Sequence, residues 1–533
     1  MKLDYLWVEA FKNLKDFKVD FDENPDELFA VLLGQNGLGK SNLLEVLVVI
    51  FRDLFLANET PFAYELRYTL RQGKIKVAVK NQPKASLPPD RFIFTVTTPR
   101  SGGALSTGGD EAFRRDDLKK PSHRCWLPRH VFAYYSGPSD RLEEHFRPHQ
   151  KAFYRDLLKG KHTLFRPLFY ARPVHSNFVL LAFFTKRDEV VEKFLRERLR
   201  IEGLESVLFV LRKPKWKGLP DGDPRFWKAA GTVKKFLSKL WDMSLAPMLI
   251  KGKIPDGFDK PKPTEFRYLH LRDLKCLQAL AQQSNTPADF FKELESTYMS
   301  SLIHETRIRV RIRQCDGSLT FRELSEGEQQ LLTVVGLIRF TKEEESLFLL
   351  DEPDTHLNPA WGMEYLSILQ EIAEAGSDSQ IVIATHDPLM IAGLRKQQVL
   401  VLERDGKNGN IIANHPEIDP RGMGVSGILK SSMFGLRTTL DLPTQAMLDE
   451  RFELSGKQRR TNTEEQRLKQ LSEELADSGF AQDFRDDNYY RYARAIAKVR
   501  GAGRLLLTGQ EIRDIDEEAL AEVKKLSHES YQR

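Results

Sequence analysis

The feature that most constrains this chain is a glycine-rich stretch, Gly-Gln-Asn-Gly-Leu-Gly-Lys-Ser, at residues 34–41. An apolar run over residues 28–33 precedes it, and apolar side chains recur at helical spacing from about Ser41 to Leu56. This pattern predicts a buried strand, a tight loop and an amphipathic helix. Glycines let successive backbone N–H groups curl around a phosphate, and the helix N-terminus adds its partial positive charge. The stretch is therefore predicted to bind phosphate. The alternative, a chance glycine turn before a helix, is disfavoured by the complete motif in this context.

Side chains of the loop and of a later strand have separate expected roles. Lys40 is expected to reach the β- and γ-phosphates of a nucleotide, and the Ser41 hydroxyl to hold Mg²⁺. An apolar strand over residues 346–350 ends in Asp351 and Glu352. In a phosphate-loop protein the first carboxylate acts on Mg²⁺ and the second polarises the attacking water. The alternative is a buried strand that simply runs out into acidic surface residues.

Two further segments are candidates for contact with the phosphates. Ser325 and Gly327 open a predicted helix and offer backbone and hydroxyl donors to an anion. The alternative is an ordinary capping box, with Ser325 as N-cap and Glu328 as its partner, and both can hold at once. A second buried strand, residues 381–384, leads to His386, which could sense the γ-phosphate. Alone, such a histidine is more often structural.

Composition excludes several classes of protein. The chain has 533 residues, of which 41% are hydrophobic and 29% charged, so it can bury a large core and remain soluble. The net charge of +5 is too small to argue nucleic-acid binding by itself. Three scattered cysteines predict neither a disulfide framework nor a metal site and favour a reducing, cytoplasmic location. The charged N-terminus is not a secretory signal, and no apolar run reaches the roughly 18 residues of a membrane span.

The order of the motifs carries a family resemblance. Four follow one another along the chain: the phosphate loop, Leu-Ser-Glu-Gly-Glu-Gln-Gln at 324–330, Phe-Leu-Leu-Asp-Glu-Pro-Asp-Thr-His-Leu-Asn-Pro at 348–359, and Ile-Ala-Thr-His-Asp at 383–387. This order resembles the ABC-type ATPases, and within them the SMC/RecF/OLD branch. The resemblance implies an α/β head that binds ATP and Mg²⁺, with ATP sandwiched between two heads. A transporter ATPase is a poorer match, because the signature carries Glu326 and no membrane span exists for it to drive.

The resemblance also implies roles for individual residues. Glu352 and His386 would be catalytic, and Ser41 and Asp351 would bind the metal. The residues implied to contact ATP are Lys12, Asn36, Gly37, Gly39, Lys40, Ser41, Asn42, Ser325, Gly327 and Glu328. Of these, Ser325, Gly327 and Glu328 would face the ATP held by Lys40 of the other subunit, and residues 354–358 would be the D-loop across the dimer. The chain departs from the family where a Q-loop glutamine is expected, because residues 136–140 stand there instead.

The expected organisation has four parts. These are residues 1–140 (N-terminal lobe with the phosphate loop), 141–300 (an inserted, mainly helical region), 301–440 (C-terminal lobe) and 441–533 (a helical tail that docks a partner). Opening strands are expected to break at Lys12-Asn13, and a closing hairpin is expected over residues 398–413. Helices are expected in the inserted region at 189–200, 225–241 and 287–299, and capping boxes in the tail at Thr463–Gln466 and Thr508–Glu511.

A narrower resemblance concerns the system in which the ATPase acts. Residues 132–139, 141–145 and 431–436, with the helical tail, are similar to the PtuA family, the ATPases of Septu and certain retron anti-phage systems. This implies a homo-oligomeric sensor and scaffold whose nucleotide state controls a separate HNH nuclease. Nucleic acid, and a retron reverse transcriptase with its msDNA, are further candidate partners. The alternatives are a RecF-like repair ATPase that acts on DNA directly and a scaffold that binds ATP but barely hydrolyses it.

Two other patterns bear on nucleic acids. The strand at residues 399–404 ends in acidic residues, but a hairpin turn at Asp405-Gly406 is a simpler reading than a TOPRIM nuclease centre, so the chain is not expected to be a nuclease itself. Residues 212–217 place four cations beside Trp216, and arginines alternate over residues 307–313. Such patterns suit phosphate neutralisation with base stacking, or they are ordinary solvated surface.

Overall fold

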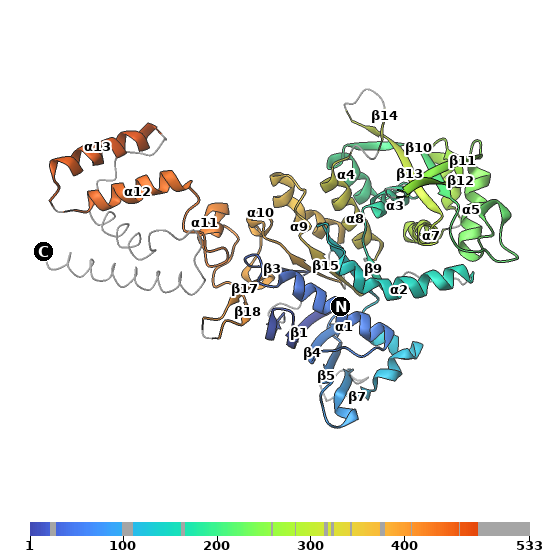
Figure 1. Ribbon diagram of the computed structural model, residues 1–533, viewed down its shortest axis with the longest axis horizontal. Coiled ribbons are helices and arrows are strands. Elements are labelled where there is room, and N and C mark those ends of the chain that lie inside the picture. Colours follow the sequence, from blue (N-terminus) through green and yellow to red (C-terminus); the bar gives the residue numbers. More distant parts are fainter. Residues whose placement is uncertain are drawn as a thin grey trace. The chain divides into compact units, whose positions relative to one another are not determined.

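The chain forms two compact units (Figure 1). A computed structural model describes residues 1–21, 28–98, 110–160, 166–256, 259–282, 284–313, 318–320, 324–341, 344–373, 379–406, 408–457 and 459–477. The first unit contains Met1–Leu32 and Gly39–Met390, and the second contains Leu33–Leu38 and Ile391–Arg533. The glycine-rich loop is therefore divided between them, with Gly39, Lys40 and Ser41 in the first unit. The predicted α/β class is confirmed, whereas the four-part division of the chain stays a prediction.

A parallel sheet forms the centre of the first unit. Its strands lie in the order β3 (Phe29–Leu33), β16 (Gln380–Ala384), β15 (Ser346–Asp351), β8 (His130–Tyr135) and β9 (Leu168–Tyr170). Every residue of β3, β15 and β16 is buried, as expected of parallel strands covered on both faces. These three strands therefore deliver the loop, the carboxylates and the histidine to one edge of the sheet, because the carboxyl ends of parallel strands point the same way.

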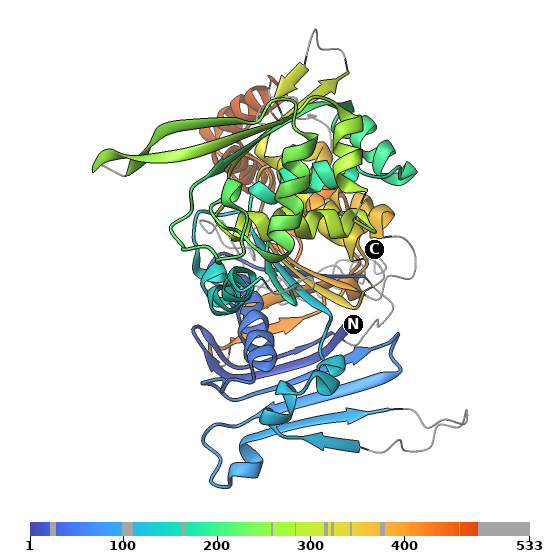
Figure 2. The same cartoon turned by 90° about the vertical axis from the view of Figure 1, so that its right-hand side faces the viewer.

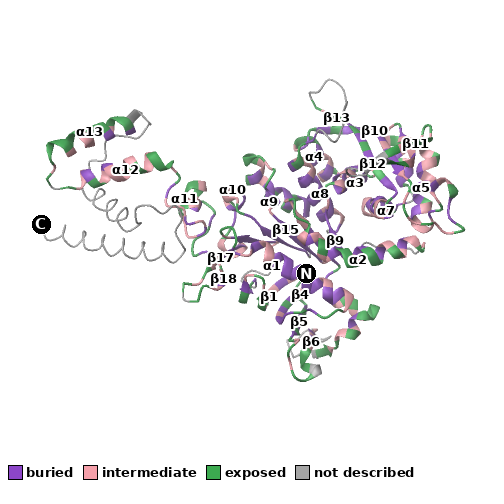
Figure 3. Cartoon of the chain, in the orientation of Figure 1, coloured by how far each residue is buried: buried purple, intermediate pink, exposed green. Residues whose placement is uncertain are grey.

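The helix that follows the loop, α1 (Lys40–Leu56), lies between this sheet and a second one. It packs across β8, β15 and β16 on one side, and on the other the ring of Phe51 meets Tyr68 edge-on at 5.8 Å. The second sheet is antiparallel, with the order β2 (Leu14–Asp20), β1 (Lys2–Phe11), β4 (Tyr64–Leu70), β5 (Ile75–Asn81), β6 (Phe92–Thr97) and β7 (Asp110–Phe113). The predicted break at Lys12-Asn13 is confirmed as the turn between β1 and β2. Figure 3 shows α1 as largely buried.

The helices between β8 and the signature segment partly match their prediction. They are α2 (Arg141–Leu158), α3 (Val174–Phe183), α4 (Glu189–Glu197), α5 (Gly231–Met243), α6 (Leu274–Ala281) and α7 (Pro287–Met299). The predicted helices at 189–200 and 287–299 are confirmed as α4 and α7. The helix predicted over 225–241 is wrong in its first turns, because Trp227 and Lys228 adopt positive φ angles of 53° and 64° and break it before α5.

The sequence did not predict a five-stranded antiparallel sheet in this region. Its order is β11 (Met248–Asp256), β12 (Asp259–Leu271), β10 (Ile201–Arg212), β13 (Ile303–Ile312) and β14 (Ser318–Thr320). Figure 2 shows β11 and β12 as a long two-stranded ribbon. Their prolines and lysines are typical of loops, although proline is tolerated in edge strands. Beyond this sheet come α8 (Glu326–Phe340) and α9 (Pro359–Ala373).

The described residues of the second unit form the closing hairpin and helices that follow it. The predicted hairpin is confirmed as β17 (Val399–Arg404) and β18 (Ile411–Asn414), and it is followed by α11 (Gly424–Lys430), α12 (Leu442–Ser455) and α13 (Asn462–Asp477). The capping box predicted at Thr463–Gln466 is wrong. Helix α13 begins at Asn462, so Thr461 is its cap: its hydroxyl accepts a hydrogen bond from the Glu464 N–H at 3.3 Å, and its own N–H donates to that carboxylate at 2.9 Å. The box predicted at Thr508–Glu511 lies outside the described residues. Among the described helices, none combines the length and apolar character that crossing a bilayer requires.

Candidate functional site

The backbone of the glycine-rich loop needs its glycines. Gly34, Gly37 and Gly39 have φ angles of 148°, 84° and 89°, a region that residues with a Cβ rarely adopt. A Cβ on Gly34 would lie 2.8 Å from the carbonyl oxygen of Leu402, and one on Gly39 would lie 2.9 Å from the side chain of Leu14. The sequence therefore places glycine where the chain must curl tightly before α1.

Lys40 begins α1 and lies among carboxylates. Its side chain is buried, and burial lowers the pKa of its ammonium, while Glu352, Asp351 and Asp354 act in the opposite direction. A partly desolvated ammonium at the N-terminus of a helix favours an anionic ligand. The structure thus brings the predicted phosphate-binding lysine to the carboxyl end of β15.

Ser41 and Asp351 are in direct contact. The Ser41 hydroxyl donates a hydrogen bond to Oδ1 of Asp351 at 3.0 Å, and Asp351 is only 1% exposed. Burial raises the pKa of Asp351 to about 6, and Glu352 raises it further, while the Ser41 hydrogen bond, Arg141 and Lys40 oppose the shift. A hydroxyl and a carboxylate at this distance form a set of oxygen donors suited to Mg²⁺. The two residues predicted to hold the metal are therefore together.

The two predicted catalytic residues also lie side by side. Glu352 has a φ of 51°, which is unusual for a residue with a side chain. This conformation is held by a hydrogen bond from its N–H to the carbonyl of Ala384, at 2.8 Å, and by the Thr355 hydroxyl, which donates to its carbonyl at 2.9 Å. Nδ1 of His386 lies 3.4 Å from Oε1 of Glu352. Strained backbone conformations of this kind cluster at functional sites.

The turn after β15 supports both catalytic residues. Asp354 is buried there and accepts a hydrogen bond from the Thr385 hydroxyl at 2.9 Å, next to His386. Burial raises the pKa of Asp354. The side chain of Gln330 on α8 donates to the carbonyl of Pro353. The turn is therefore tied both to the end of β16 and to the signature helix.

The signature segment is a capped helix start. Ser325 is the N-cap of α8: its hydroxyl accepts from the Glu328 N–H at 3.2 Å, and its own N–H donates to the Glu328 carboxylate at 2.7 Å. The capping-box reading is confirmed. A Cβ on Gly327 would lie 2.4 Å from the carbonyl oxygen of His356, so only glycine lets α8 approach the turn after β15 this closely. Within the part of the chain that the structure describes, no hydrogen bond or ion pair joins these signature residues to Lys40 or Ser41.

Lys12 is engaged by α1. Its ammonium donates to both carboxylate oxygens of Glu45, at 2.7 and 2.5 Å. Nε2 of His145 lies 2.9 Å from the same carboxylate, and its Nδ1 lies 3.0 Å from a guanidinium nitrogen of Arg52. Burial acts to raise the pKa of Glu45, but the hydrogen bonds from His145 and Lys12 outweigh it and leave the pKa lowered. Lys12 thus joins the β1–β2 turn to α1, and its predicted contact with ATP stays a prediction.

The other predicted ATP contacts lie in or beside the loop. The side chain of Asn42 donates to Oδ1 of Asn13 at 2.6 Å, which ties α1 to the β1–β2 turn. Asn36 and Gly37 are exposed. These two residues are thus open to solvent, whereas the side chain of Asn42 is hydrogen-bonded to Asn13.

The sequence analysis did not assign a role to Arg141. It is the first residue of α2, and Nη2 lies 3.8 Å from Oδ2 of Asp351. Ser136, in the segment where the Q-loop glutamine was expected, donates its N–H to the Asp351 carbonyl at 3.3 Å, and its hydroxyl lies 3.1 Å from that of Thr355. The segment 136–140 stood out in the sequence as unexplained, but it held no signal for Arg141 itself.

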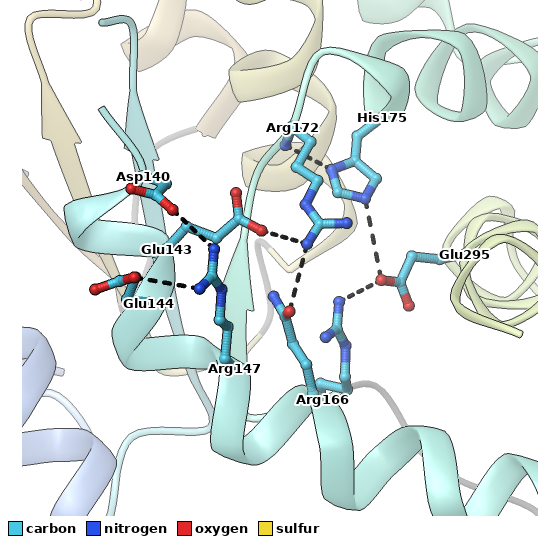
Figure 4. A network of polar contacts seen from close by, with 9 residues as sticks. Asp140, Glu143, Glu144, Arg147, Arg166, Arg172, His175 and Glu295 are labelled. Carbon is cyan, nitrogen blue, oxygen red and sulfur yellow. Dashed lines mark hydrogen bonds and ion pairs between the residues drawn. The ribbon is translucent and has the colours of Figure 1, made fainter. Parts of the chain in front are cut away.

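An ion pair joins α2 to the segment between β9 and α3, and further polar contacts lie beside it (Figure 4). Arg172 donates to Glu143 of α2, and Arg166 pairs with Glu295 of α7. Nε2 of His175 lies 4.0 Å from Glu295. Because α2 begins with Arg141, this network links the position of a cation in the site to the inserted region.

Comparisons with known proteins cover parts of the chain. Residues 267–392 match a family described as "AAA domain, putative AbiEii toxin, Type IV TA system", and residues 1–120 match one described as "AAA ATPase domain". The chain is similar to Septu protein PtuA of Bacillus mycoides (strain KBAB4), with 26% identity over 208 residues, 37% of this chain and 28% of that protein. It is 25% identical over 160 residues to Septu protein PtuA of Bacillus thuringiensis, covering 27% of this chain and 40% of that protein. The matches thus span less than half of either relative.

A shorter match and two solved structures add to these. Protein ea59 of Escherichia phage lambda is 29% identical over 116 residues, 22% of this chain and 21% of that protein. The SMC head domain from Thermotoga maritima aligns with 78% of this chain and 100% of its own, at 13% identity and a TM-score of 0.32. An Smc head bound to the C-winged helix domain of ScpA aligns with 78% and 98%, at 12% identity and a TM-score of 0.33.

Proposed function

We propose that this chain, an SMC/RecF-like ABC-type ATPase related to PtuA, binds ATP with Mg²⁺, hydrolyses it, and acts as the ATPase subunit of an anti-phage defence complex. The observation that carries this proposal is the meeting of Ser41 and Asp351 at 3.0 Å beside the buried Lys40. Lys40 neutralises charge on the β- and γ-phosphates, and Ser41 and Asp351 hold the metal. The metal supplies positive charge to the phosphate oxygens when bound.

The remaining site residues divide the work of hydrolysis. Glu352 holds and polarises the attacking water, because its backbone conformation fixes the carboxylate at the end of β15. His386 lies against this carboxylate at 3.4 Å and keeps it oriented. Arg141, at 3.8 Å from Asp351, favours the ionised form of that carboxylate, which is the form that binds a metal ion.

ATP is proposed to join two copies of the chain. Among the described residues, no hydrogen bond or ion pair joins Ser325, Gly327 or Glu328 to Lys40 or Ser41, and we assign the start of α8 to the ATP of a second copy. A ligand shared by two subunits adds its binding free energy only to the closed dimer, so ATP shifts the equilibrium toward that dimer. Hydrolysis then reverses the shift.

The defence role rests on the relation to PtuA and includes a separate HNH nuclease as partner, with a cytoplasmic location. Among the residues that the structure describes, no group of three or more His, Cys, Asp or Glu side chains could hold a metal ion. The acidic end of β17 is a hairpin turn, in which the Asp405 N–H donates to the Asn410 carbonyl at 2.8 Å. This turn accounts for the acidic residues without a nuclease centre, and we assign nuclease activity to another chain. A retron reverse transcriptase with its msDNA is proposed only as an additional member of the complex.

The test is the mass of the protein in solution with and without ATP. Glu352→Gln removes the group that polarises water but leaves the ATP-binding residues in place, so this variant is expected to stay dimeric with ATP, while the unaltered chain returns to its ATP-free mass as ATP is consumed. Lys40→Ala is expected to show no ATP-dependent change. Glu371→Gln, at an exposed ion pair with Lys193 on α4, is the matched control and should behave like the unaltered chain.

Two outcomes would contradict the proposal. If the mass of the Glu352→Gln protein in solution does not change when ATP is added, the proposed ATP-bridged dimer is contradicted. Tight, ATP-gated binding of DNA ends by the chain alone, with no effect on a co-expressed HNH nuclease, would favour the RecF-like repair function instead.

A further inference from the structure

One face of the five-stranded sheet carries a row of cations. Arg307, Arg309 and Arg311 of β13 are exposed, whereas Ile308 and Val310 between them are 1% and 0% exposed. Side chains alternate across a strand, so the three guanidinium groups leave the sheet on the same side, about 7 Å apart along β13. The opposite side of β13 packs into the core.

The neighbouring strand leaves space beside these arginines. Arg311 lies opposite Gly203 of β10, and Arg309 lies opposite Ser206. A Cβ on Gly203 would meet Nη2 of Arg311 at 2.7 Å, so this guanidinium lies over Gly203. Small residues on β10 therefore leave room for the guanidinium groups on this face.

Aromatic side chains occupy the same face further along. His270 of β12 lies opposite Leu208 of β10, which in turn lies opposite Arg307. Tyr268 is two residues from His270 and points the same way, and both are half-buried. Directly opposite residues of antiparallel strands share a face, so the aromatic groups and the arginines form one surface.

The edge of this surface is apolar. The rings of Phe266 and His304 lie 5.6 Å apart. Met248 and Ile250 of the edge strand β11 lie opposite Tyr268 and Phe266, and they are 52% and 41% exposed. Apolar side chains this exposed, beside rings and cations, mark an interaction surface.

The three arginines on this face differ in whether they have an ion-pair partner. Arg307 pairs with Glu305 at 2.9 Å. Arg309 and Arg311 have no ion pair among the described residues. In the other basic pattern of the sequence, residues 212–217, the Trp216 indole donates to the Ser300 carbonyl at 2.7 Å and Lys213 pairs with Glu265 at 3.3 Å, whereas Lys215 and Lys217 are exposed. Arg309 and Arg311 are therefore available to an anionic partner.

We propose that this face, formed by β10, β12 and β13, binds single-stranded nucleic acid. Phosphates lie on Arg309 and Arg311, and unpaired bases stack on Tyr268 and His270. A sheet with accessible rings is a known way to hold unstacked bases, whereas the bases of a duplex are already stacked and paired. An acidic peptide would match the arginines but would make no use of the rings. This binding does not depend on the proposed ATPase cycle, because none of these residues belongs to the ATP site.

The test measures binding of the full chain to a fluorescent single strand of about 16 nucleotides by anisotropy, at several salt concentrations. Each phosphate contact to a single strand contributes about 0.7 to the slope of log affinity against log salt, so R309A/R311A is expected to reduce that slope by about 1.4. Loss of one stacked base weakens binding about 5- to 150-fold, so Y268L is expected to bind that much more weakly, while Y268F retains binding. ATP hydrolysis by all variants should be unchanged.

The matched control removes two cations from another exposed strand. Lys76 and Lys80 are exposed on β5, so K76A/K80A changes the net charge as R309A/R311A does. The proposal is overturned if the single strand does not bind, if K76A/K80A weakens binding as much as R309A/R311A, or if Y268F and Y268L bind equally well. It is also overturned if polyglutamate or a duplex of the same sequence competes as effectively as the single strand.

Discussion

The pair of Arg166 and Glu295 is expected to be the most sensitive point of the inserted region. Arg166 is 3% exposed and Glu295 is 4% exposed, and the two are in direct contact between the segment before β9 and α7 (Figure 4). Burial raises the pKa of Glu295 and lowers that of Arg166. The guanidinium nonetheless stays charged, because its ordinary pKa lies far above neutral pH. Removing the glutamate would therefore leave a buried charge without its counterion.

The cost can be worked out from the remaining contacts of Arg166. Its Nε and Nη1 atoms are buried without a hydrogen-bond partner, so Glu295 provides its hydrogen-bonded contact. The rings of Phe153 and Phe169, at 5.2 and 5.1 Å, give partial compensation. Breaking a buried pair from one side costs about 3–5 kcal/mol, and cation–π contacts offset about 1–2 kcal/mol of it, so Glu295→Ala is expected to cost about 1–4 kcal/mol.

The assay is denaturant unfolding of the full chain, followed by fluorescence. The double variant R166M/E295L replaces both partners by apolar groups, and it should recover most of the stability lost in Glu295→Ala, because no charge is then buried. Glu371→Gln, at a pair whose side chains are about half exposed, should change the stability by less than about 1 kcal/mol. The reasoning is refuted if Glu295→Ala costs no more than Glu371→Gln, or if the double variant is less stable than the single one.

Three other results are expected. Gly327→Ala would place a Cβ 2.4 Å from the His356 carbonyl, so it should lower ATP hydrolysis several-fold with nucleotide binding retained; unchanged turnover would contradict the close packing of α8. Burial lowers the pKa of His149 to about 4, and the charges of Arg166 and Arg124 lower it further. As pH falls, this histidine therefore takes up a proton in the unfolded chain before it does so in the folded chain. The free energy of unfolding should therefore be highest above pH ~6.5 and fall by at most about 3 kcal/mol towards pH 4. His149→Gln should flatten this pH dependence in unfolding measurements. Removal of Mg²⁺ by EDTA should abolish hydrolysis, and Ser41→Ala should raise the Mg²⁺ concentration needed to restore it, since Ser41 contacts Asp351; an unchanged requirement would exclude this serine as a ligand.

The site illustrates which features of a fold a sequence pattern can predict. The strand–loop–helix around Lys40 and the acidic end of β15 were predictable, because an apolar run and a glycine turn are local signals. The meeting of Lys40, Asp351 and His386 followed from parallel strands that share one edge. By contrast, Arg141 has no local signal, because its distance to Asp351 depends on how α2 packs.

The sequence by itself determined the α/β class and the order of the motifs, since spacing and periodicity are read from neighbouring residues. The tertiary structure decided that Lys12 pairs with Glu45, that Gly327 must lie against the turn after β15, and that the region after α2 contains a five-stranded sheet. These depend on strand register and on contacts between residues far apart in the chain. Such contacts form only when the whole core is packed. The sequence alone therefore could not place the arginines of β13 on the same face as Tyr268.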